Sequence, residues 1–313
     1  MAVMDLYDVT VIGAGPAGLS AALYAARARL KTLVLDKMGP GGTIANVDFL
    51  ENYPGFAQGI TGPELGVAMQ QQAEKFGAEF AFREVQGVRR GEDDLLLLAT
   101  AEGDISSRTV IVATGSEPRK LGVPGEGEFT GRGVSYCATC DGAFYRDKRV
   151  VVVGGGDSAI TEALFLTRFA SRVIVVHRRD QLRATKVLQD RAFANDKIDF
   201  EWNAVVKSVL GEDKVERVLL GDVRDGTERE VACDGVFVYI GNDPNTAFLR
   251  GSGVDLDDRG YIPTDERMRS NIPGLWAAGD VRAKSLRQVV TAVADGAVAA
   301  VDAEEYISQR WGH

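Results

Sequence analysis

The sequence predicts an α/β fold made of two similar domains, with the second domain inserted into the first. Two glycine-rich turns predict this arrangement, because each lies between a buried strand pattern and a helix pattern, at residues 13–18 and 154–159. A chain of 313 residues is also long enough for about two domains with cores of their own.

The first turn belongs to a complete strand–helix–strand unit. Residues 7–12 predict a buried parallel strand, residues 19–29 an alanine-rich helix, and residues 32–36 a second strand that ends in Asp36. One glycine makes the tight turn, one lets the backbone approach a pyrophosphate, and one lets helix and strand pack closely. The unit predicts a Rossmann-like dinucleotide site, in which Asp36 accepts a hydrogen bond from a ribose hydroxyl. Its glycines are Gly13, Gly15 and Gly18.

The second turn repeats the pattern with a different ending. Residues 149–153 predict a strand, residues 160–169 a helix, and residues 172–176 a strand that ends in basic residues instead of an acid. Clustered guanidinium groups suit a ribose 2′-phosphate, whereas a carboxylate suits a free 2′-hydroxyl. We therefore expect an FAD-like first site and an NADP-like second site, and the alternative for the basic cluster is a solvated surface. The residues of the second site are Gly154, Gly156, Asp157, Ser158, His177, Arg178, Arg179 and Arg183.

Strand patterns outside these two units place the boundaries of the insertion. A strand over 109–115 ends in a turn before Pro118, and a strand over 235–240 leads into the return segment 241–246. The predicted first domain is therefore discontinuous, residues 1–116 and 245–313, and the inserted domain spans 117–244. A last strand over 272–280 ends in Asp280, at the kind of strand end where open α/β sheets bind ligands. Residues 288–307 predict a terminal helix.

The cysteines favour redox chemistry over a structural framework. Two residues separate Cys137 from Cys140, and Cys233 stands alone. Three cysteines are too few for the disulfides of a secreted protein of this length. A zinc site is the weaker alternative, because four ligands are needed and the chain has two histidines. Two inert core thiols are the remaining alternative. We expect Cys233 to be a small buried residue.

Charge and hydropathy exclude several classes of function. The formal net charge is −9, so a large nucleic-acid footprint is not expected. The apolar runs are short and interrupted by glycine, which predicts no transmembrane segment. The first eight residues lack the basic start of a signal peptide, and the cysteine usage fits a reducing compartment, so we expect a cytoplasmic protein.

Further motifs cover essentially the whole chain together with the two turns. They are Glu51-Asn52-Tyr53-Pro54-Gly55, Ala113-Thr114-Gly115, Cys137-Ala138-Thr139-Cys140-Asp141-Gly142, His177-Arg178-Arg179-Asp180, Pro244-Asn245-Thr246, Ala278-Gly279-Asp280-Val281 and Arg287-Gln288. On these residues the chain resembles the low-molecular-weight thioredoxin reductases, two-domain flavoproteins that use FAD and NAD(P)H. The cysteine run is the most specific motif, since other flavin disulfide reductases carry their cysteine pair in the first domain.

The resemblance implies a path for electrons. NADPH would deliver hydride to FAD, and the reduced flavin would reduce the Cys137–Cys140 disulfide through Cys140. Cys137 would then attack the disulfide of thioredoxin or a thioredoxin-like protein, with Asp141 as the acid and base for the thiol protons. The family's homodimer is expected here as well. The FAD contacts that the motifs carry over are Gly13, Gly15, Gly18, Asp36, Asn52, Asp280, Arg287 and Gln288.

Three departures from the family pattern support a second hypothesis. Thr43 stands where the family usually has glutamine, Thr161 replaces one of two adjacent acids, and Phe49 lies in a segment that is usually polar. The alternative is an enzyme of the same fold that does not use NADPH. It would be linked to ferredoxin, or would hold a second flavin in the nucleotide site and run electrons from dithiol to flavin. A sensor without catalysis is a third hypothesis, against which the intact cysteine pair and Asp141 speak.

The C-terminal residues Arg310-Trp311-Gly312-His313 allow two interpretations. The aromatic tail could stack over a flavin face and block the nicotinamide, or it could be a frayed chain end.

Overall fold

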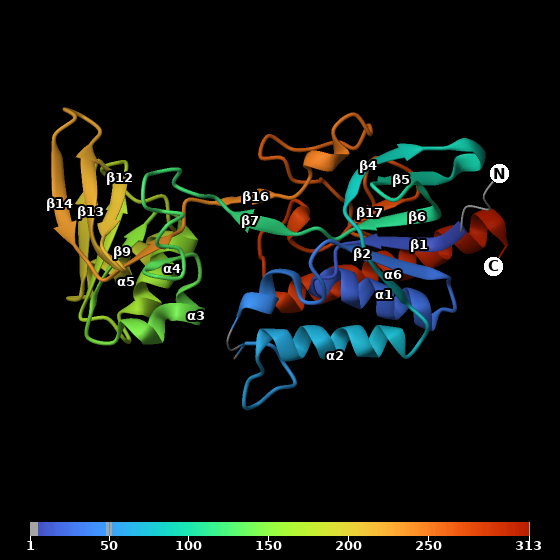
Figure 1. Cartoon of the computed structure of the whole chain (residues 1–313), viewed down its shortest axis with the longest axis horizontal. Helices are drawn as coiled ribbons and strands as arrows, with labels where there is room; N and C mark the ends of the chain where they lie inside the picture. The colour runs from blue at the N-terminus through green and yellow to red at the C-terminus, as the bar shows by residue number, and fades with distance from the viewer. Residues whose placement is uncertain (1–5, 48–49, 51, 313) are drawn as a thin grey trace. The chain divides into compact units, whose positions relative to one another are not determined.

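The computed structural model describes residues 6–47, 50 and 52–312 (Figure 1). The side chain of Cys140 and the residue Phe49 lie outside the described part. The chain separates into two compact units. Unit 1 consists of Met1–Glu117 and Asp243–His313, and unit 2 of Pro118–Asn242.

Unit 1 is built on a mixed sheet in the order β3-β2-β1-β6-β5-β4, with β17 paired to β6. Strands β1, β2, β3, β6 and β17 pair in parallel, whereas β4, β5 and β6 form an antiparallel meander. The bounds are β1 Leu6–Ile12, β2 Thr32–Asp36, β3 Glu79–Phe82, β4 Val85–Arg90, β5 Leu96–Thr100, β6 Ile105–Val112 and β17 Leu275–Ala277. The parallel strands bring Asp36, Ala113 and the turn after Ile12 to one edge, because their carboxyl ends point the same way.

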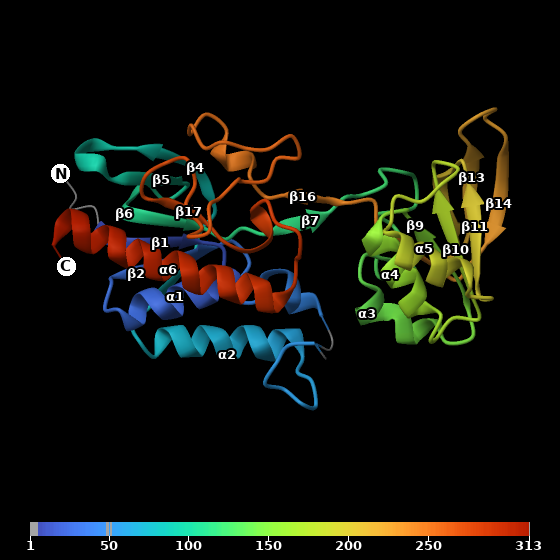
Figure 2. The same ribbon diagram turned by 180° about the vertical axis from the view of Figure 1, so that it is seen from behind.

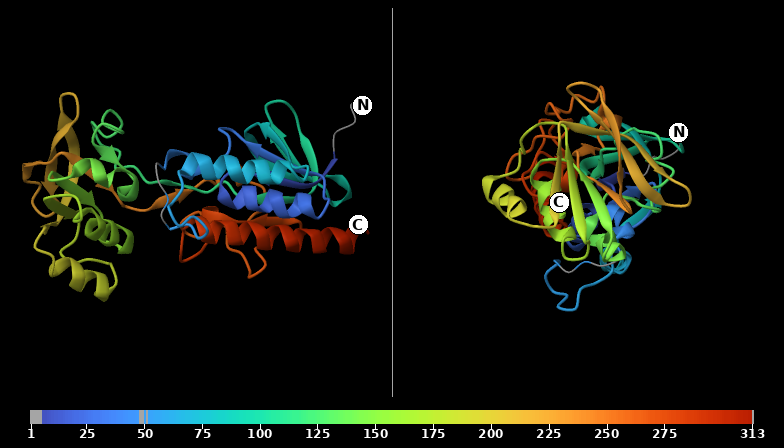
Figure 3. Two further views of the ribbon diagram at one scale, coloured as in Figure 1. Left: turned by 90° about the horizontal axis from the view of Figure 1, so that it is seen from below. Right: turned by 90° about the vertical axis from the view of Figure 1, so that its left-hand side faces the viewer.

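Three helices pack together in unit 1, α1 (Pro16–Arg27), α2 (Gly62–Glu74) and α6 (Val289–Trp311). Helix α1 contacts both others, and the left panel of Figure 3 shows the three side by side. Their alanines share a core with Val9 and Val11 of β1. A Cβ on Gly296 would lie 2.0 Å from the backbone oxygen of Ala17, so α6 approaches α1 at a distance that only glycine permits.

Unit 2 repeats the layered arrangement on a smaller scale (Figure 2). Its sheet has the order β11-β10-β9-β15-β8, all parallel, and an antiparallel sheet β12-β13-β14 shares a core with one face. The helices pack on the other face. The strands are β8 Val134–Ser135, β9 Arg149–Val153, β10 Arg172–His177, β11 Ile198–Trp202, β12 Ala204–Gly211, β13 Val215–Asp222, β14 Glu228–Ala232 and β15 Gly235–Val238. The helices are α3 Ala138–Asp141, α4 Asp157–Leu166 and α5 Lys186–Phe193.

The chain passes between the units twice, and both passages contain short strands. Strands β7 (Ser116–Pro118) and β16 (Asn242–Pro244) pair as a two-stranded sheet. Beside them in unit 1, the Asn245 amide donates to the backbone oxygen of Thr114 at 3.0 Å, and the Thr114 hydroxyl donates to the backbone oxygen of Asn245 at 2.8 Å. The outgoing and returning segments are thus joined by hydrogen bonds.

The terminal helix is longer than the sequence pattern predicts. Helix α6 continues four residues past Ile307 to Trp311 and ends at Gly312, which has a φ of +68°. Trp311 packs edge-to-face on Tyr306, and the Arg108 guanidinium lies 5.6 Å from its ring. Arg108 pairs with Asp8 near the amino ends of β1 and β6. The chain is therefore not frayed up to Trp311, and this tryptophan lies at the edge opposite the first glycine turn. Both interpretations of the tail are wrong for Trp311, and His313 lies outside the described residues.

Candidate functional site

Each glycine of the first turn occupies its position for a different structural reason. Gly13 has a φ of +106°, and a Cβ there would lie 2.4 Å from the backbone oxygen of Ala113. A Cβ on Gly18 would lie 1.8 Å from the backbone oxygen of Gly13, so helix and turn need a glycine to pack. Gly15 has no heavy atom within 4 Å of its Cβ position. The space at Gly15, before the N-terminus of α1, suits a bound pyrophosphate.

Asp36 fastens this turn from the end of β2. Its Oδ2 accepts from the backbone N–H of Ala14 at 2.7 Å, and its Oδ1 accepts from those of Met38 and Gly39 at 2.7 and 2.9 Å. A carboxylate oxygen has two lone pairs, so Oδ2 keeps capacity for a ribose hydroxyl. The predicted ribose contact stays a prediction, and the backbone role is one that the sequence pattern did not indicate.

The second half of unit 1 supplies further predicted residues. Asp280 follows β17 in the turn η5 (Gly279–Val281), and its Oδ1 is buried with no hydrogen-bond partner among the described residues. Burial raises the pKa of this carboxyl. An enclosed acceptor without a donor is the feature that a ligand hydroxyl would satisfy.

Three more predicted FAD contacts have partners near the start of α6: Arg287, Asn52 and Gln288. The Arg287 guanidinium lies 4.2 Å from the centre of the Tyr261 ring, and its Nε is buried without a partner in the described part of the chain. The Asn52 amide donates to the Gln288 side-chain oxygen at 3.0 Å, although the two residues are far apart in sequence. The structure thus brings together Asn52 and Gln288, two of the predicted FAD contacts.

The turn after β9 repeats the design of the first turn. Gly154 has a φ of +153°, and its Cβ position lies 2.4 Å from the backbone oxygen of Tyr239. Gly156 has open space around its Cβ position, as Gly15 does. The carboxylate of Asp157, the first residue of α4, accepts from the backbone N–H of Thr185 at 2.6 Å. Ser158 is exposed beside it.

His177 lies beneath this turn. A Cβ on Gly155 would lie 2.3 Å from the imidazole Nδ1, so the ring occupies the space that a side chain would need. The ring is buried, and its Nε2 has no partner among the described residues. Burial first, and then the charges of Arg183, Arg179 and Arg178, lower its pKa. The ring therefore supports the turn from inside as a neutral group.

The three predicted arginines gather around the end of β10. Arg178, Arg179 and Arg183 are exposed, and within the described residues none of their guanidinium groups has a hydrogen bond or ion pair. The backbone N–H of Arg183 donates to Gly155 at 2.7 Å, which fixes it beside the glycine turn. All three charges act on His177, which places them at one locus. Unpaired guanidinium groups at the edge of a glycine-rich turn suit a phosphate.

The cysteine run lies at the short helix α3 of unit 2. Cys137 is disulfide-bonded and Cys233 is free. The backbone N–H of Cys137 donates to the Ser135 hydroxyl at 3.1 Å, and that of Ala138 donates to the Tyr239 phenol oxygen at 2.6 Å. Tyr239 also packs by its backbone oxygen on Gly154, so one residue contacts both the cysteine segment and the second glycine turn.

Cys233 has the environment predicted for it. It is 3% exposed, and burial raises the pKa of its thiol to about 12. A thiol that stays protonated and has no access to solvent is a poor nucleophile.

The departures from the family pattern take different positions. Thr43 is exposed in the turn η1 (Gly42–Asn46), and a Cβ on Gly42 would lie 3.0 Å from the Cα of Gly15. Gly42, the neighbour of Thr43, thus packs on the first turn, a contact that the sequence pattern did not indicate. Thr161 is exposed on α4, whereas the next residue, Glu162, has a buried Oε2 without a partner in the described part and a pKa raised by burial. Phe49 lies outside the described residues.

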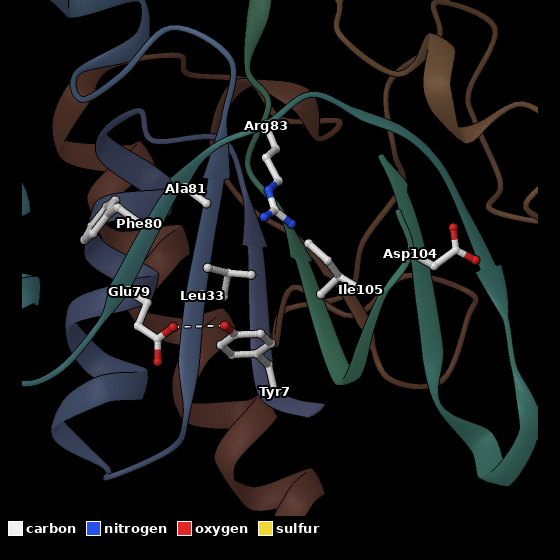
Figure 4. A pocket seen from close by; sticks show the side chains of 8 residues that line it. All are labelled: Tyr7, Leu33, Glu79, Phe80, Ala81, Arg83, Asp104 and Ile105. Atoms are coloured by element: carbon white, nitrogen blue, oxygen red, sulfur yellow. Dashed lines mark hydrogen bonds between the residues drawn. The ribbon is translucent and has the colours of Figure 1, made fainter. Parts of the chain in front are cut away.

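A hollow of about 330 Å³ opens elsewhere in unit 1 (Figure 4). The Tyr7 phenol donates to Glu79 at 2.9 Å inside it. Its lining consists of Tyr7, Leu33, Glu79, Phe80, Ala81, Arg83, Asp104 and Ile105. None of the predicted site residues lines this hollow, so it is separate from the candidate site.

The described residues contain neither a candidate membrane span nor a candidate metal cluster. No helix there is both long and apolar enough to cross a membrane. The same residues contain no group of three or more histidine, cysteine, aspartate or glutamate side chains arranged to hold a metal ion.

Comparison with known proteins gives a consistent result. Residues 7–296 match the family model described as pyridine nucleotide-disulphide oxidoreductase. A thioredoxin reductase of Treponema pallidum is 52% identical over 96% of this chain and 97% of its own. One of Bacillus subtilis is 50% identical over 97% of this chain and 96% of its own. The crystal structure of a thioredoxin reductase from Streptococcus pyogenes is 50% identical, covers 97% of this chain and 99% of its own, and has a TM-score of 0.79. The predicted α/β fold class, with the second domain inserted into the first, is confirmed.

Proposed function

Because this chain belongs to the pyridine nucleotide-disulphide oxidoreductase family, we propose that it carries electrons from NADPH through FAD and the Cys137–Cys140 pair to the disulfide of thioredoxin. The chain is an oxidoreductase, and the resemblance inferred from its motifs is confirmed by relatives about half identical over nearly its whole length. The observation that carries the proposal is the disulfide-bonded Cys137 beside a nucleotide-type turn, with Tyr239 in contact with both.

FAD is proposed for the first site. The open space at Gly15 suits its pyrophosphate, and the enclosed Oδ1 of Asp280 suits a hydroxyl of its ribityl chain. The unpartnered Nε of Arg287 and the Asn52–Gln288 pair add donors near the start of α6. When bound, FAD supplies a two-electron carrier between a nicotinamide and a disulfide.

NADPH is proposed as the electron donor at the second site. The three unpaired arginines suit a 2′-phosphate, and the space at Gly156 suits the pyrophosphate. Asp157 holds this site from the surface through its bond to Thr185, and the buried His177 supports it through the contact with Gly155.

The cysteine pair exchanges disulfides with the partner protein. The Cys137 thiolate attacks one sulfur of the thioredoxin disulfide, forms a mixed disulfide and releases the other sulfur as a thiolate. Cys140 then attacks the sulfur of Cys137, which restores the Cys137–Cys140 disulfide and releases the second thioredoxin sulfur. Asp141 exchanges protons with these thiols. A homodimer in the cytoplasm, as in the family that the motifs resemble, completes the proposal.

Gly15→Ala and Gly156→Ala form a matched pair that separates the two nucleotide sites. Both glycines have negative φ values and open space, so an added methyl group leaves the fold intact. We expect Gly15→Ala to purify with less than about one tenth of the wild-type flavin, because the methyl group occupies the space of the pyrophosphate. Gly156→Ala should keep its flavin and weaken only NADPH. Flavin absorbance per chain and the KM for NADPH measure this, and equal flavin in both variants would contradict the assignment.

An anaerobic titration with NADPH tests the whole proposal. The visible flavin band should bleach promptly, and added oxidised thioredoxin should restore it. A flavin that is reduced by dithionite or a dithiol but not by NADPH would contradict NADPH as the electron donor. That outcome would favour a ferredoxin-linked enzyme or one with a second flavin, and the number of FAD molecules per chain would then separate these two.

A further inference from the structure

A group of buried charges lies behind the turn that carries Asp280. Asp295 of α6 accepts from the Lys284 ammonium at 2.7 Å and from the Arg282 guanidinium at 3.3 and 3.4 Å. The side chains of Lys284, Asp295 and Arg282 are 7%, 10% and 14% exposed. Lysine is rarely buried unless it is paired, because removing an ammonium group from water is unfavourable. The hydrogen bonds to Asp295 therefore fix the positions of these buried cations.

Asp295 also holds the backbone of the turn. Its Oδ2 accepts from the N–H of Gly279 at 3.0 Å, one residue before Asp280. Gly279 has a φ of +79°, and a Cβ there would lie 2.8 Å from the Cβ of Ala17. The peptide between Ala278 and Gly279 is therefore fixed from two sides, by the carboxylate of α6 and by the first turn of α1.

The fixed peptide between Ala278 and Gly279 determines where the Asp280 carboxylate points. Its Oδ1 is enclosed and unpartnered in the described part of the chain, so its position depends on the backbone that carries it. Lys284 acts electrostatically on Asp280 as well as pairing with Asp295, which places one buried cation beside both acids. None of the motifs includes Asp295, Lys284 or Arg282.

We propose that Asp295 is a positioning residue of the flavin site: it holds the Gly279 N–H, and with Lys284 and Arg282 it sets Asp280 for the hydroxyl of the bound flavin. This inference rests on the proposed function, because it assumes that unit 1 binds FAD. Asp295 does not touch the cofactor and acts through the turn that it holds.

Asp302 provides a matched control on the same helix. It is also a buried acid of α6, and it accepts from Arg267, Arg269 and the Trp276 indole. Its hydrogen-bond partners in the described part of the chain do not include the Gly279 turn. Asp295→Asn and Asp302→Asn therefore each neutralise one buried acid of α6 and leave its cationic partners in place. Only the first change alters a residue that is bonded to the turn of Asp280.

The test is the rate of FAD release from the purified full-length holoprotein, followed by the rise in flavin fluorescence. We expect Asp295→Asn to release FAD about tenfold faster than wild type, and Asp302→Asn to release it within about twofold of wild type even if its melting temperature falls. Release from Asp295→Asn at the wild-type rate overturns the proposal. Equally fast release from both variants also overturns it, because the effect would then be a general loosening of α6.

Two further results keep the test decisive. If Asp295→Asn does not fold, Lys284→Met replaces it, since this variant keeps the bond from Gly279 to Asp295 but removes the cation that orients the carboxylate. Its FAD release should be about threefold faster than wild type, and an unchanged rate overturns the proposal. Wild-type protein that neither purifies with flavin nor binds added FAD refutes the proposed function itself. If the wild-type protein binds flavin and the variant releases FAD at the wild-type rate, only the proposed role of Asp295 is refuted.

Discussion

Replacing either cysteine of the pair, as Cys137→Ser or Cys140→Ser, should lower thioredoxin reduction by roughly 10³-fold or more. A serine hydroxyl cannot form or open a disulfide, so the two electrons have no path out of the flavin. The flavin itself should still bleach with NADPH, because both nucleotide sites remain intact. The measurement is NADPH oxidation with thioredoxin as acceptor, beside anaerobic bleaching of the same preparation.

Cys233→Ser is the matched control for this prediction. The thiol is buried and its pKa is raised to about 12, so it takes no part in exchange at neutral pH. Its activity should stay close to that of the wild type once any loss of stability is allowed for. If Cys140→Ser retained full turnover, the proposed role of the pair would be wrong, and the electrons would have to leave the flavin by a path that does not include Cys140.

The glycine turns could be predicted from sequence because their geometry depends on few neighbouring residues. Gly13 and Gly18 meet backbone atoms that the strand–turn–helix unit itself supplies, and Gly15 is left open by the same unit. The position of Asp36 at the end of β2 also follows from the local pattern. Its three bonds to backbone N–H groups do not, since the loop that contains Met38 and Gly39 has no regular signature.

The charged group behind Asp280 could not be predicted in the same way. Asp295 is one of four acids in an alanine- and valine-rich helix, and nothing in that pattern indicates whether it faces water or the core. Its partners lie 11 to 16 residues earlier in an irregular segment. Only the packing of α6 against η5 and α1 decides where this side chain points.

The end of the chain shows the same limit. The apolar pattern predicts a helix to Ile307, but α6 continues to Trp311 because Tyr306 and Arg108 provide contacts for the tryptophan ring. Arg108 is the fourth residue of β6 and is far from Trp311 in sequence. Tertiary contacts of this kind extend helices beyond what local propensity supports.

The double change Arg178→Ala/Arg179→Ala should turn the second site from NADPH toward NADH. Both guanidinium groups are exposed and unpaired in the described part, so their removal breaks no internal bond. A hydrogen bond to a charged group contributes about 1.5–3 kcal/mol, and two such bonds give a loss of roughly 10²-fold or more in kcat/KM for NADPH. NADH lacks the 2′-phosphate, so its kcat/KM should change less than about threefold.

Arg191→Ala on α5 controls for the loss of surface charge, because Arg191 is exposed in the same unit but does not belong to the cluster. It should leave the preference for NADPH unchanged. Equal losses for NADPH and NADH in the double variant would mean that the arginines hold the site together instead of reading the phosphate. An unchanged kcat/KM for both nucleotides would contradict an NADPH site at β10. The basic cluster would then be a solvated surface or would bind another phosphate-rich ligand, such as the second flavin of the alternative hypothesis.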